Sequence, residues 1–212
     1  MNAHAATSLT ILPALGRLDA LLARAAGITN ERVSTSSDES NEAIIDGVRR
    51  LLDRSPGEPA FAYGEPLSPY PSQGNRFETI ADVCDLNDFD LDVVVLALAP
   101  ELDRRYERIY AWLQQDANEW RPTVNLALDL FCCDATARIE QRARFGAGSP
   151  LIRSRAIELD GNGTLLSRVI RLDEQLVRYL TGDDGLDARL DGFAGITQPD
   201  DRNGAPGSPR KR

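Results

Sequence analysis

The sequence has 212 residues, a formal net charge of −9 and 42% hydrophobic residues, which suits one globular domain with an attached segment. This acidic balance disfavours nucleic acid and anionic membrane surfaces as partners of the chain as a whole. Its apolar runs are too short for a transmembrane helix, and the first residues lack the pattern of a secretory signal. Three cysteines, two of them adjacent, indicate a reduced, cytoplasmic protein rather than a disulfide framework.

Residues 1–54 are predicted to form an N-terminal helical segment. An amphipathic helix is expected over about 14–26, with Gly27 as its end, and it packs either on the rest of the chain or on another protein. Asn41 is expected to cap a second helix that runs to about Leu52. The apolar residues on the expected face of the first helix are Leu15, Leu18, Leu22 and Ala25.

The next stretch, residues 55–76, is rich in proline and glycine and is predicted to be an irregular connection. It separates the N-terminal segment from the main domain, which is expected over 77–197. A short helix from Phe77 leads into that domain. Residues 198–212 have the composition of a disordered tail with a basic end.

The main domain is organised around residues 86–130, which contain its strongest helix-start signals. Asn87 is a favourable N-cap, and Asp90 lies three residues later as its capping-box partner. The apolar run 91–99 has the β-branched content of a buried strand, but these caps favour a helix. Pro100 is expected to end that helix.

Three further helices are predicted on short connections. Asp103 is expected to cap the first of them, Thr123 the second and Asp134 the third, which ends at Gly146. The expected buried face of the first comprises Tyr106, Ile109, Tyr110 and Leu113, because these residues follow the helical spacing of one face.

The hydrophobic period then changes from helical to alternating. Residues 151–159 and 165–172 are expected to form two strands around Asp160-Gly161-Asn162-Gly163, a strong hairpin signal. A helix capped by Asp173 and a shorter one over about 186–190 follow. Helices followed by a two-stranded hairpin predict a mainly α, winged-helix-like domain with an N-terminal helical appendage.

Residues 89–130 contain the run FDLDVVVLALAPELDRRYERIYAWLQQD followed by RPTVNLALDL. This phrase resembles the N-terminal winged-helix region of bacterial AAA-type ATPases, a group that includes members associated with contractile injection systems. The resemblance is most specific in 86–130 and continues through 151–180. In such ATPases the N-terminal domain commonly recruits substrates or adaptors. The resemblance therefore implies a recognition domain whose partner is a protein substrate, an adaptor or a separate ATPase subunit.

No catalytic, cofactor-binding or metal-ligating residue is predicted, so the chain is not expected to be an enzyme. The phosphate-binding motif G-x-x-x-x-G-K-[ST] is missing from the sequence, whose single lysine is Lys211. Cys132 and Cys133 lack metal-ligand spacing, and His4 is the sole histidine. The acidic stretch 85–92 lacks the glycine and glutamate of a calcium loop.

Residues 136–171 contain an excess of arginine within this acidic chain. These arginines either form a solvated face or pair with the acidic start of the first core helix, or they dock a protein, or they contact DNA through a recognition helix and wing. The last option defines the alternative function, a stand-alone winged-helix DNA-binding regulator. The candidate partner-binding residues are Arg138, Arg142, Arg144, Arg153, Arg155, Arg168 and Arg171.

Overall fold

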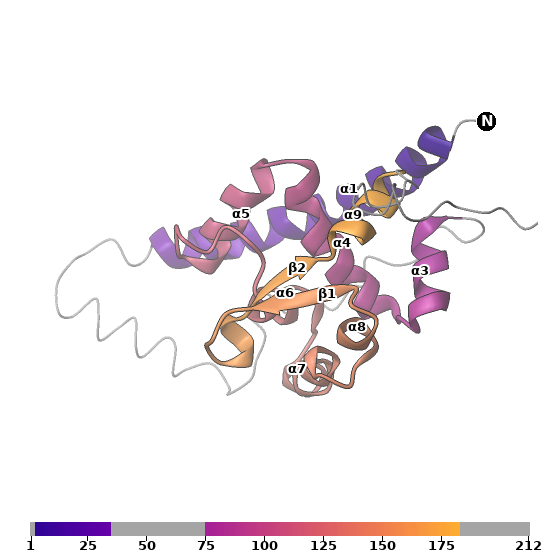
Figure 1. The fold of residues 1–212 in the computed structure, drawn as a ribbon. Helices are drawn as coiled ribbons and strands as arrows, with labels where there is room; N and C mark the ends of the chain where they lie inside the picture. The colour runs from indigo at the N-terminus through magenta and orange to yellow at the C-terminus, as the bar shows by residue number, and fades with distance from the viewer. Residues whose placement is uncertain (1–2, 35–74, 183–212) are drawn as a thin grey trace, which may run out of the picture.

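The computed structural model describes residues 3–34 and 75–182 (Figure 1). The predicted helix beginning at Asn41, most of the 55–76 connection, the short helix near 186–190 and the 198–212 tail lie outside these residues. The described helices are α1 (Ala3–Ser34), α3 (Arg76–Cys84), α4 (Asp88–Leu102), α5 (Arg105–Gln114), α6 (Val124–Phe131), α7 (Ala135–Arg142), α8 (Pro150–Arg153) and α9 (Glu174–Thr181), with the 3-10 helices η1 (Ala143–Phe145) and η2 (Leu165–Ser167) and the strands β1 (Ile157–Asp160) and β2 (Val169–Leu172).

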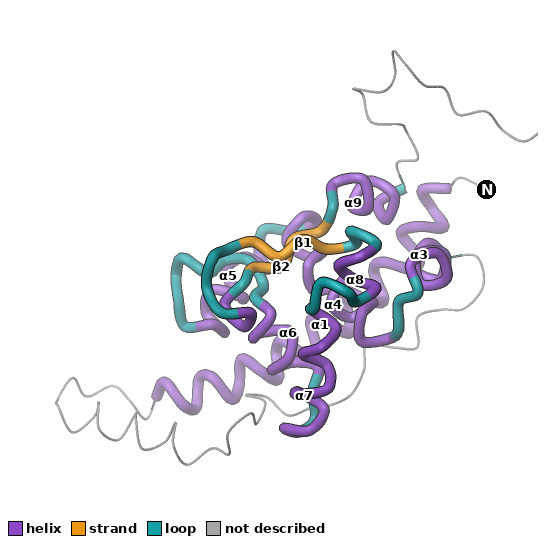
Figure 2. Tube along the Cα trace, turned by 60° about the horizontal axis from the view of Figure 1, so that its bottom comes forward, coloured by secondary structure: helices purple, strands orange, loops and turns teal. Residues whose placement is uncertain are grey.

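The helix α4 is the centre of the fold. Figures 1 and 2 show α1 on one side of it and the β1–β2 hairpin on the other, and both contact α4. Every residue from Phe89 to Pro100 is buried, so this part of the helix is enclosed on all sides, as expected of a central helix. None of the described helices is both long and apolar enough to cross a membrane.

The caps predicted for α4 are confirmed. The Asn87 side chain accepts a hydrogen bond from the Asp90 amide at 2.9 Å, and the Asp90 carboxylate accepts one from the Asn87 amide at 3.0 Å. Leu86 and Leu91, which flank this box, are both buried. The reciprocal cap satisfies two amides that the first helical turn leaves without partners, and this favours a helix over a strand for a valine-rich run.

The prediction that Pro100 ends this helix is wrong, because α4 continues to Leu102. A proline within a helix provides no amide for the carbonyl four residues earlier, here that of Leu96. The Tyr110 hydroxyl takes the place of that amide and donates to the Leu96 oxygen at 2.9 Å. Burial holds the pKa of Tyr110 well above its ordinary value, so the hydroxyl remains protonated and able to donate.

The helix α1 is longer than predicted, since it continues past Gly27 to Ser34. A glycine costs about 1 kcal/mol in a helix interior and does not by itself end a helix. The predicted face is confirmed for Leu18, Leu22 and Ala25, which are buried, while Leu15 is partly buried. This face contacts α4, α5, α6 and α9, so α1 packs within the chain rather than standing apart from it.

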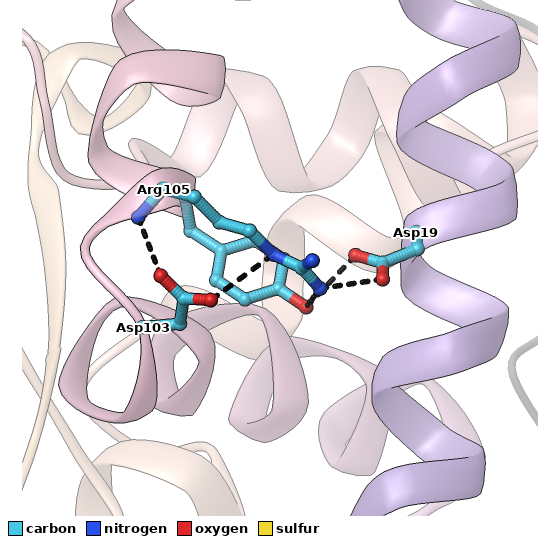
Figure 3. Close-up of polar contacts among 4 residues, drawn as sticks. Asp19, Asp103 and Arg105 are labelled. Carbon is cyan, nitrogen blue, oxygen red and sulfur yellow. Dashed lines mark hydrogen bonds and ion pairs between the residues drawn. The ribbon is translucent and has the colours of Figure 1, made fainter.

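A polar network fixes α1 against α5 (Figure 3). The Arg105 guanidinium contacts the Asp19 carboxylate at 2.6 Å, and the Tyr106 hydroxyl donates to the same carboxylate at 2.8 Å. Asp103, the predicted cap of α5, accepts from the Arg105 amide at 2.8 Å, although the N-cap position itself is Arg104. The predicted inner face of α5 is confirmed by the burial of Tyr106, Tyr110 and Leu113, with Ile109 half-buried.

The short helix α3 begins one residue before its predicted start at Phe77, with Asn75 as its N-cap. Among its apolar residues, Ile80 is buried, Cys84 is half-buried and Val83 is 79% exposed. At the first residue of α3, the Arg76 guanidinium donates to the Tyr179 carbonyl of α9 at 2.7 Å. This hydrogen bond joins the start of the main domain to its last described helix.

The hairpin is confirmed, but its strands are shorter than predicted. β1 and β2 are antiparallel, with Ile157 opposite Leu172 and Asp160 opposite Val169. Residues 150–153 form α8 instead of a strand, because Ser149 and Pro150 provide a helix start with proline at the first position. Residues 165–167 form η2, so the connection between the strands is longer than a two-residue turn.

A third backbone segment extends the hairpin. Thr123 pairs with Val169, and the Ile170 amide donates to the Pro122 carbonyl at 2.8 Å. The Gln114 side chain positions this segment, because its amide oxygen accepts from the Thr123 hydroxyl at 2.6 Å. The predicted caps Thr123, Asp134 and Asp173 are all confirmed by side-chain hydrogen bonds to the first turns of α6, α7 and α9.

The Tyr110–Leu96 hydrogen bond leads to a stability prediction. Tyr110→Phe leaves a buried carbonyl without a partner and is expected to cost about 1–3 kcal/mol of unfolding free energy. Pro100→Ala restores the backbone amide that donates to the Leu96 carbonyl in a regular helix. Tyr110→Phe should therefore cost less in the Pro100→Ala background, and urea denaturation of the four proteins measures this coupling. Strictly additive effects would contradict the assigned role of the hydroxyl.

Candidate functional site

The arginine-rich part of the chain forms a helix-turn-helix followed by the hairpin. α6 and α7 are joined by the turn 132–134, and Asp134 caps α7 by accepting from the Ala137 amide at 2.8 Å. η1 follows α7 directly and contacts α8, which leads into β1. In proteins that read DNA with this motif, the second helix, here α7, lies in the major groove with its N-terminal residues at the base edges.

Arg138 points inward from α7. Its guanidinium contacts the Asp129 carboxylate of α6 at 2.6 Å and donates to the Asn125 side-chain oxygen at 2.6 Å. The Arg138 side chain is only 11% exposed. The arginine nearest the start of α7 is therefore used to join α7 to α6.

Arg144 is also held inside the molecule. Its guanidinium contacts both carboxylate oxygens of Asp90, which is completely buried at the start of α4; the Nε–Oδ1 distance is 2.9 Å. The hydrogen bond to Asp90, together with the charge of that carboxylate, raises the pKa of Arg144 above its ordinary value. The pair fixes η1 against the first turn of α4, and it matches the interpretation in which the arginines pair with that acidic helix start.

The other predicted arginines differ in their surroundings. Arg171 lies 3.5 Å from Asp160 across the hairpin, in an exposed pair. Arg168 is half-buried, and its buried Nε has no hydrogen-bond partner. The side chains of Arg142, Arg153 and Arg155 are exposed and make no hydrogen bond or ion pair with the described residues. The structure thus places two of the seven arginines, Arg138 and Arg144, in internal pairs and leaves Arg142, Arg153 and Arg155 exposed.

The outer side of α7 is mixed in character. Ile139 is 69% exposed, and Glu140 and Arg142 are exposed beside it in the sequence. At the N-terminus of α7, the hydrogen bond from the Ala137 amide lowers the pKa of Asp134, so this exposed carboxylate is charged at neutral pH. We call Ile139, Glu140, Arg142, Arg153 and Arg155 the α7–α8 face.

The cysteines contribute no visible reactive centre in the described part of the chain. Burial raises the pKa of Cys132 to about 11, so its thiol stays protonated and packs as an apolar group. Cys133, by contrast, is exposed next to Asp134. No group of histidine, cysteine or acidic residues with metal-binding geometry occurs within 3–34 and 75–182.

The helix-turn-helix, the hairpin and the third pairing segment at Thr123 have the order of elements expected for a winged helix. Residues 67–194 match the family model described as "Winged helix domain, variant". The chain belongs to this winged-helix family. No curated protein and no solved structure gives a significant match. The winged-helix domain defined by this match begins after α1, yet α1 contributes to its core.

Sequence reasoning found the arginine-rich region but missed which arginines of the winged-helix domain are internal. The sequence did contain a signal for the internal arginines, namely the carboxylate with which each of them pairs. Asp90 and Asp129 each interrupt an apolar helix, and a carboxylate on such a helix needs a cation or a hydrogen bond when it is buried. Neither the partner of Asp90 nor that of Asp129 could be identified without the packing of α4, α6 and α7.

The two classes of arginine should respond differently to truncation. Arg144→Ala leaves the buried Asp90 carboxylate without its cation and is expected to cost about 3–5 kcal/mol of unfolding free energy. Arg142→Ala removes an exposed side chain two residues away and should change that free energy by less than about 0.5 kcal/mol. Urea denaturation measures both. Equal effects of the two changes would show that the Asp90–Arg144 pair is not structurally important.

Proposed function

We propose that this winged-helix domain is a non-catalytic docking module, equivalent to the N-terminal region of an AAA-type ATPase, and that it binds a protein through the α7–α8 face. The partner is a protein substrate, an adaptor or a separate ATPase subunit. The resemblance of residues 86–130 to that region supports the link to ATPases. The structure adds that this stretch forms the central helix α4, then α5 and α6.

The composition of α7 is the observation that carries the choice of a protein over DNA. At the end of α7 that would approach the bases, the exposed side chains include the charged carboxylate of Asp134. Arg138, the first arginine of the helix, is occupied by Asp129. A carboxylate at this position repels phosphate, whereas the exposed Ile139 provides an apolar contact of the kind found in protein interfaces.

The exposed arginines fit the same proposal. Arg142 directly precedes η1, Arg153 ends α8 and Arg155 follows it, and η1 contacts α8. The three side chains have no internal partner among the described residues. Arginine is enriched at protein interfaces because its planar group pairs with carboxylates and stacks on apolar surfaces. An apolar residue together with free arginines can dock a protein that has complementary acidic residues.

We expect no ATP binding by the chain alone. The sequence lacks the G-x-x-x-x-G-K-[ST] motif whose backbone amides and lysine hold phosphates. Isothermal titration calorimetry with ATP and magnesium should give only heats of dilution. Stoichiometric binding with micromolar affinity would contradict the non-catalytic assignment.

A gel-shift titration with random duplex DNA separates docking from DNA binding. At about 150 mM salt we expect negligible binding by the purified chain, because the overall charge is −9 and α7 begins with a carboxylate. A DNA-binding module would instead bind near micromolar concentration, with an affinity that falls with salt at roughly −0.9 per phosphate contact on a log-log plot. Loss of such binding on Arg153→Gln, with the fold intact, would establish the alternative function.

Site-specific photo-crosslinking in the producing cell tests the protein partner. A crosslinking side chain at position 139 should form a discrete protein adduct, and one at position 175, on the exposed start of α9, should not. Arg153→Gln should reduce the adduct. The matched control is Gln175→Glu, because it lowers the net charge by the same single unit. Identical labelling from positions 139 and 175 would exclude the α7–α8 face as the docking site.

A further inference from the structure

A second surface of different composition lies on α5. Arg104, at the helix cap, Arg108 and Trp112 follow one another at four-residue spacing, which places them along one side of the helix. That side lies opposite the buried Tyr106, Tyr110 and Leu113, so it faces solvent. Trp112 is 41% exposed and the Arg104 side chain is 90% exposed. We call Arg104, Arg108 and Trp112 the α5 surface.

The α5 surface borders a cleft of about 570 Å³ that is rich in cations. Its described lining comprises Arg104, Arg105, Glu107, Arg108 and Ile109. Glu107 is the single carboxylate among them, and it meets Arg104 at 3.2 Å in an exposed pair that contributes little stability. Among these lining residues three arginines face one carboxylate, and Asp19 and Asp103 offset the charge of Arg105, so Arg104 and Arg108 provide the positive charge of the wall.

The arginines of this cleft differ in how firmly they are held. Arg105 is fixed by Asp19 at 2.6 Å and by Asp103 at 3.3 Å, so it forms a rigid part of the wall (Figure 3). Arg108 is exposed and makes no side-chain hydrogen bond or ion pair with the described residues. Arg108 can therefore accept a carboxylate from another molecule without breaking an internal contact, and Arg104 can do so at the cost of only its exposed contact with Glu107.

Trp112 gives the α5 surface an apolar anchor. Tryptophan and arginine are the residue types most enriched among those that dominate binding energy at protein interfaces. A half-exposed tryptophan beside the unpaired Arg108 and the weakly paired Arg104 can contact an apolar side chain while the arginines bind carboxylates. We propose that the α5 surface binds an acidic segment of a partner protein, with carboxylates on Arg104 and Arg108 and an apolar side chain against Trp112.

The surrounding charges favour an acidic protein segment over a nucleic acid. A single strand of nucleic acid follows a continuous basic groove. Here the cations are limited to one side of α5, and the exposed acids Glu101 and Asp116 lie at the ends of α4 and α5. Figures 1 and 2 show α5 and α7 at separate parts of the molecule, so this site is independent of the α7–α8 face.

Intrinsic fluorescence provides a direct test, because Trp112 and Trp120 are the two tryptophans of the chain. The probe is a synthetic peptide of glutamate, aspartate and leucine, titrated into the full chain carrying Trp120→Phe. Binding should change the emission of Trp112 with a saturable dependence on peptide concentration. The same peptide with every acid replaced by its amide should bind at least roughly tenfold more weakly, since it cannot form charge-assisted contacts.

Matched variants assign the binding to the α5 surface. Arg108→Gln should weaken peptide binding by roughly tenfold, while Gln175→Glu, with the same change in net charge, should leave it unchanged. Calorimetry of Trp112→Ala should show a comparable loss and does not depend on fluorescence. Circular dichroism confirms that each variant is folded.

Three outcomes would overturn the inference. Equal binding of the acidic and amide peptides would show that the arginines do not recognise carboxylates. Tighter binding of a single-stranded oligonucleotide than of the acidic peptide would make this a nucleic-acid site. Saturable binding that Arg108→Gln leaves unchanged would place the peptide elsewhere. None of these outcomes depends on whether the α7–α8 face docks a protein.

Discussion

The Asp90 carboxylate is the group on which the arrangement of the domain most depends. It is completely buried, yet it accepts from the Asn87 amide and pairs with Arg144. The hydrogen bond from the Asn87 amide caps the start of α4, and the pair with Arg144 holds η1 against the first turn of that helix. Since a buried carboxylate without partners is strongly unfavourable, α4 and the segment after α7 are required to meet at this point. The orientation of the α7–α8 face follows from this contact.

Local signals in the sequence were sufficient for most of the helices. Asn87, Thr123, Asp134 and Asp173 were predicted as caps and act as caps, because a cap depends on residues within one helical turn. The hairpin around Gly161 was predicted for the same reason, and Gly161 has the positive φ of 110° that favours glycine in such a turn. The family match confirms the winged-helix class that these signals indicated.

The errors came from contacts between residues distant in the sequence. Pro100 does not end α4 because a tyrosine ten residues later serves the Leu96 carbonyl, and the spacing of apolar residues does not reveal this. The seven candidate arginines were grouped by position in the chain, whereas the fold separates Arg138 and Arg144 from Arg153 by pairing the first two internally. The α5 surface was not predicted, since Arg108 and Trp112 follow the same helical pattern as ordinary solvated residues.

The contact between α1 and α9 has a consequence for how the protein is made. These are the first and last described helices, and they pack against each other and share the core with α4. During synthesis at 5–20 residues per second, α1 leaves the ribosome on the order of ten seconds before α9. Throughout that interval the leucines of α1 lack part of their packing surface. Premature aggregation in the cell should therefore depend on translation speed, which is a sensitivity that the folded structure does not show.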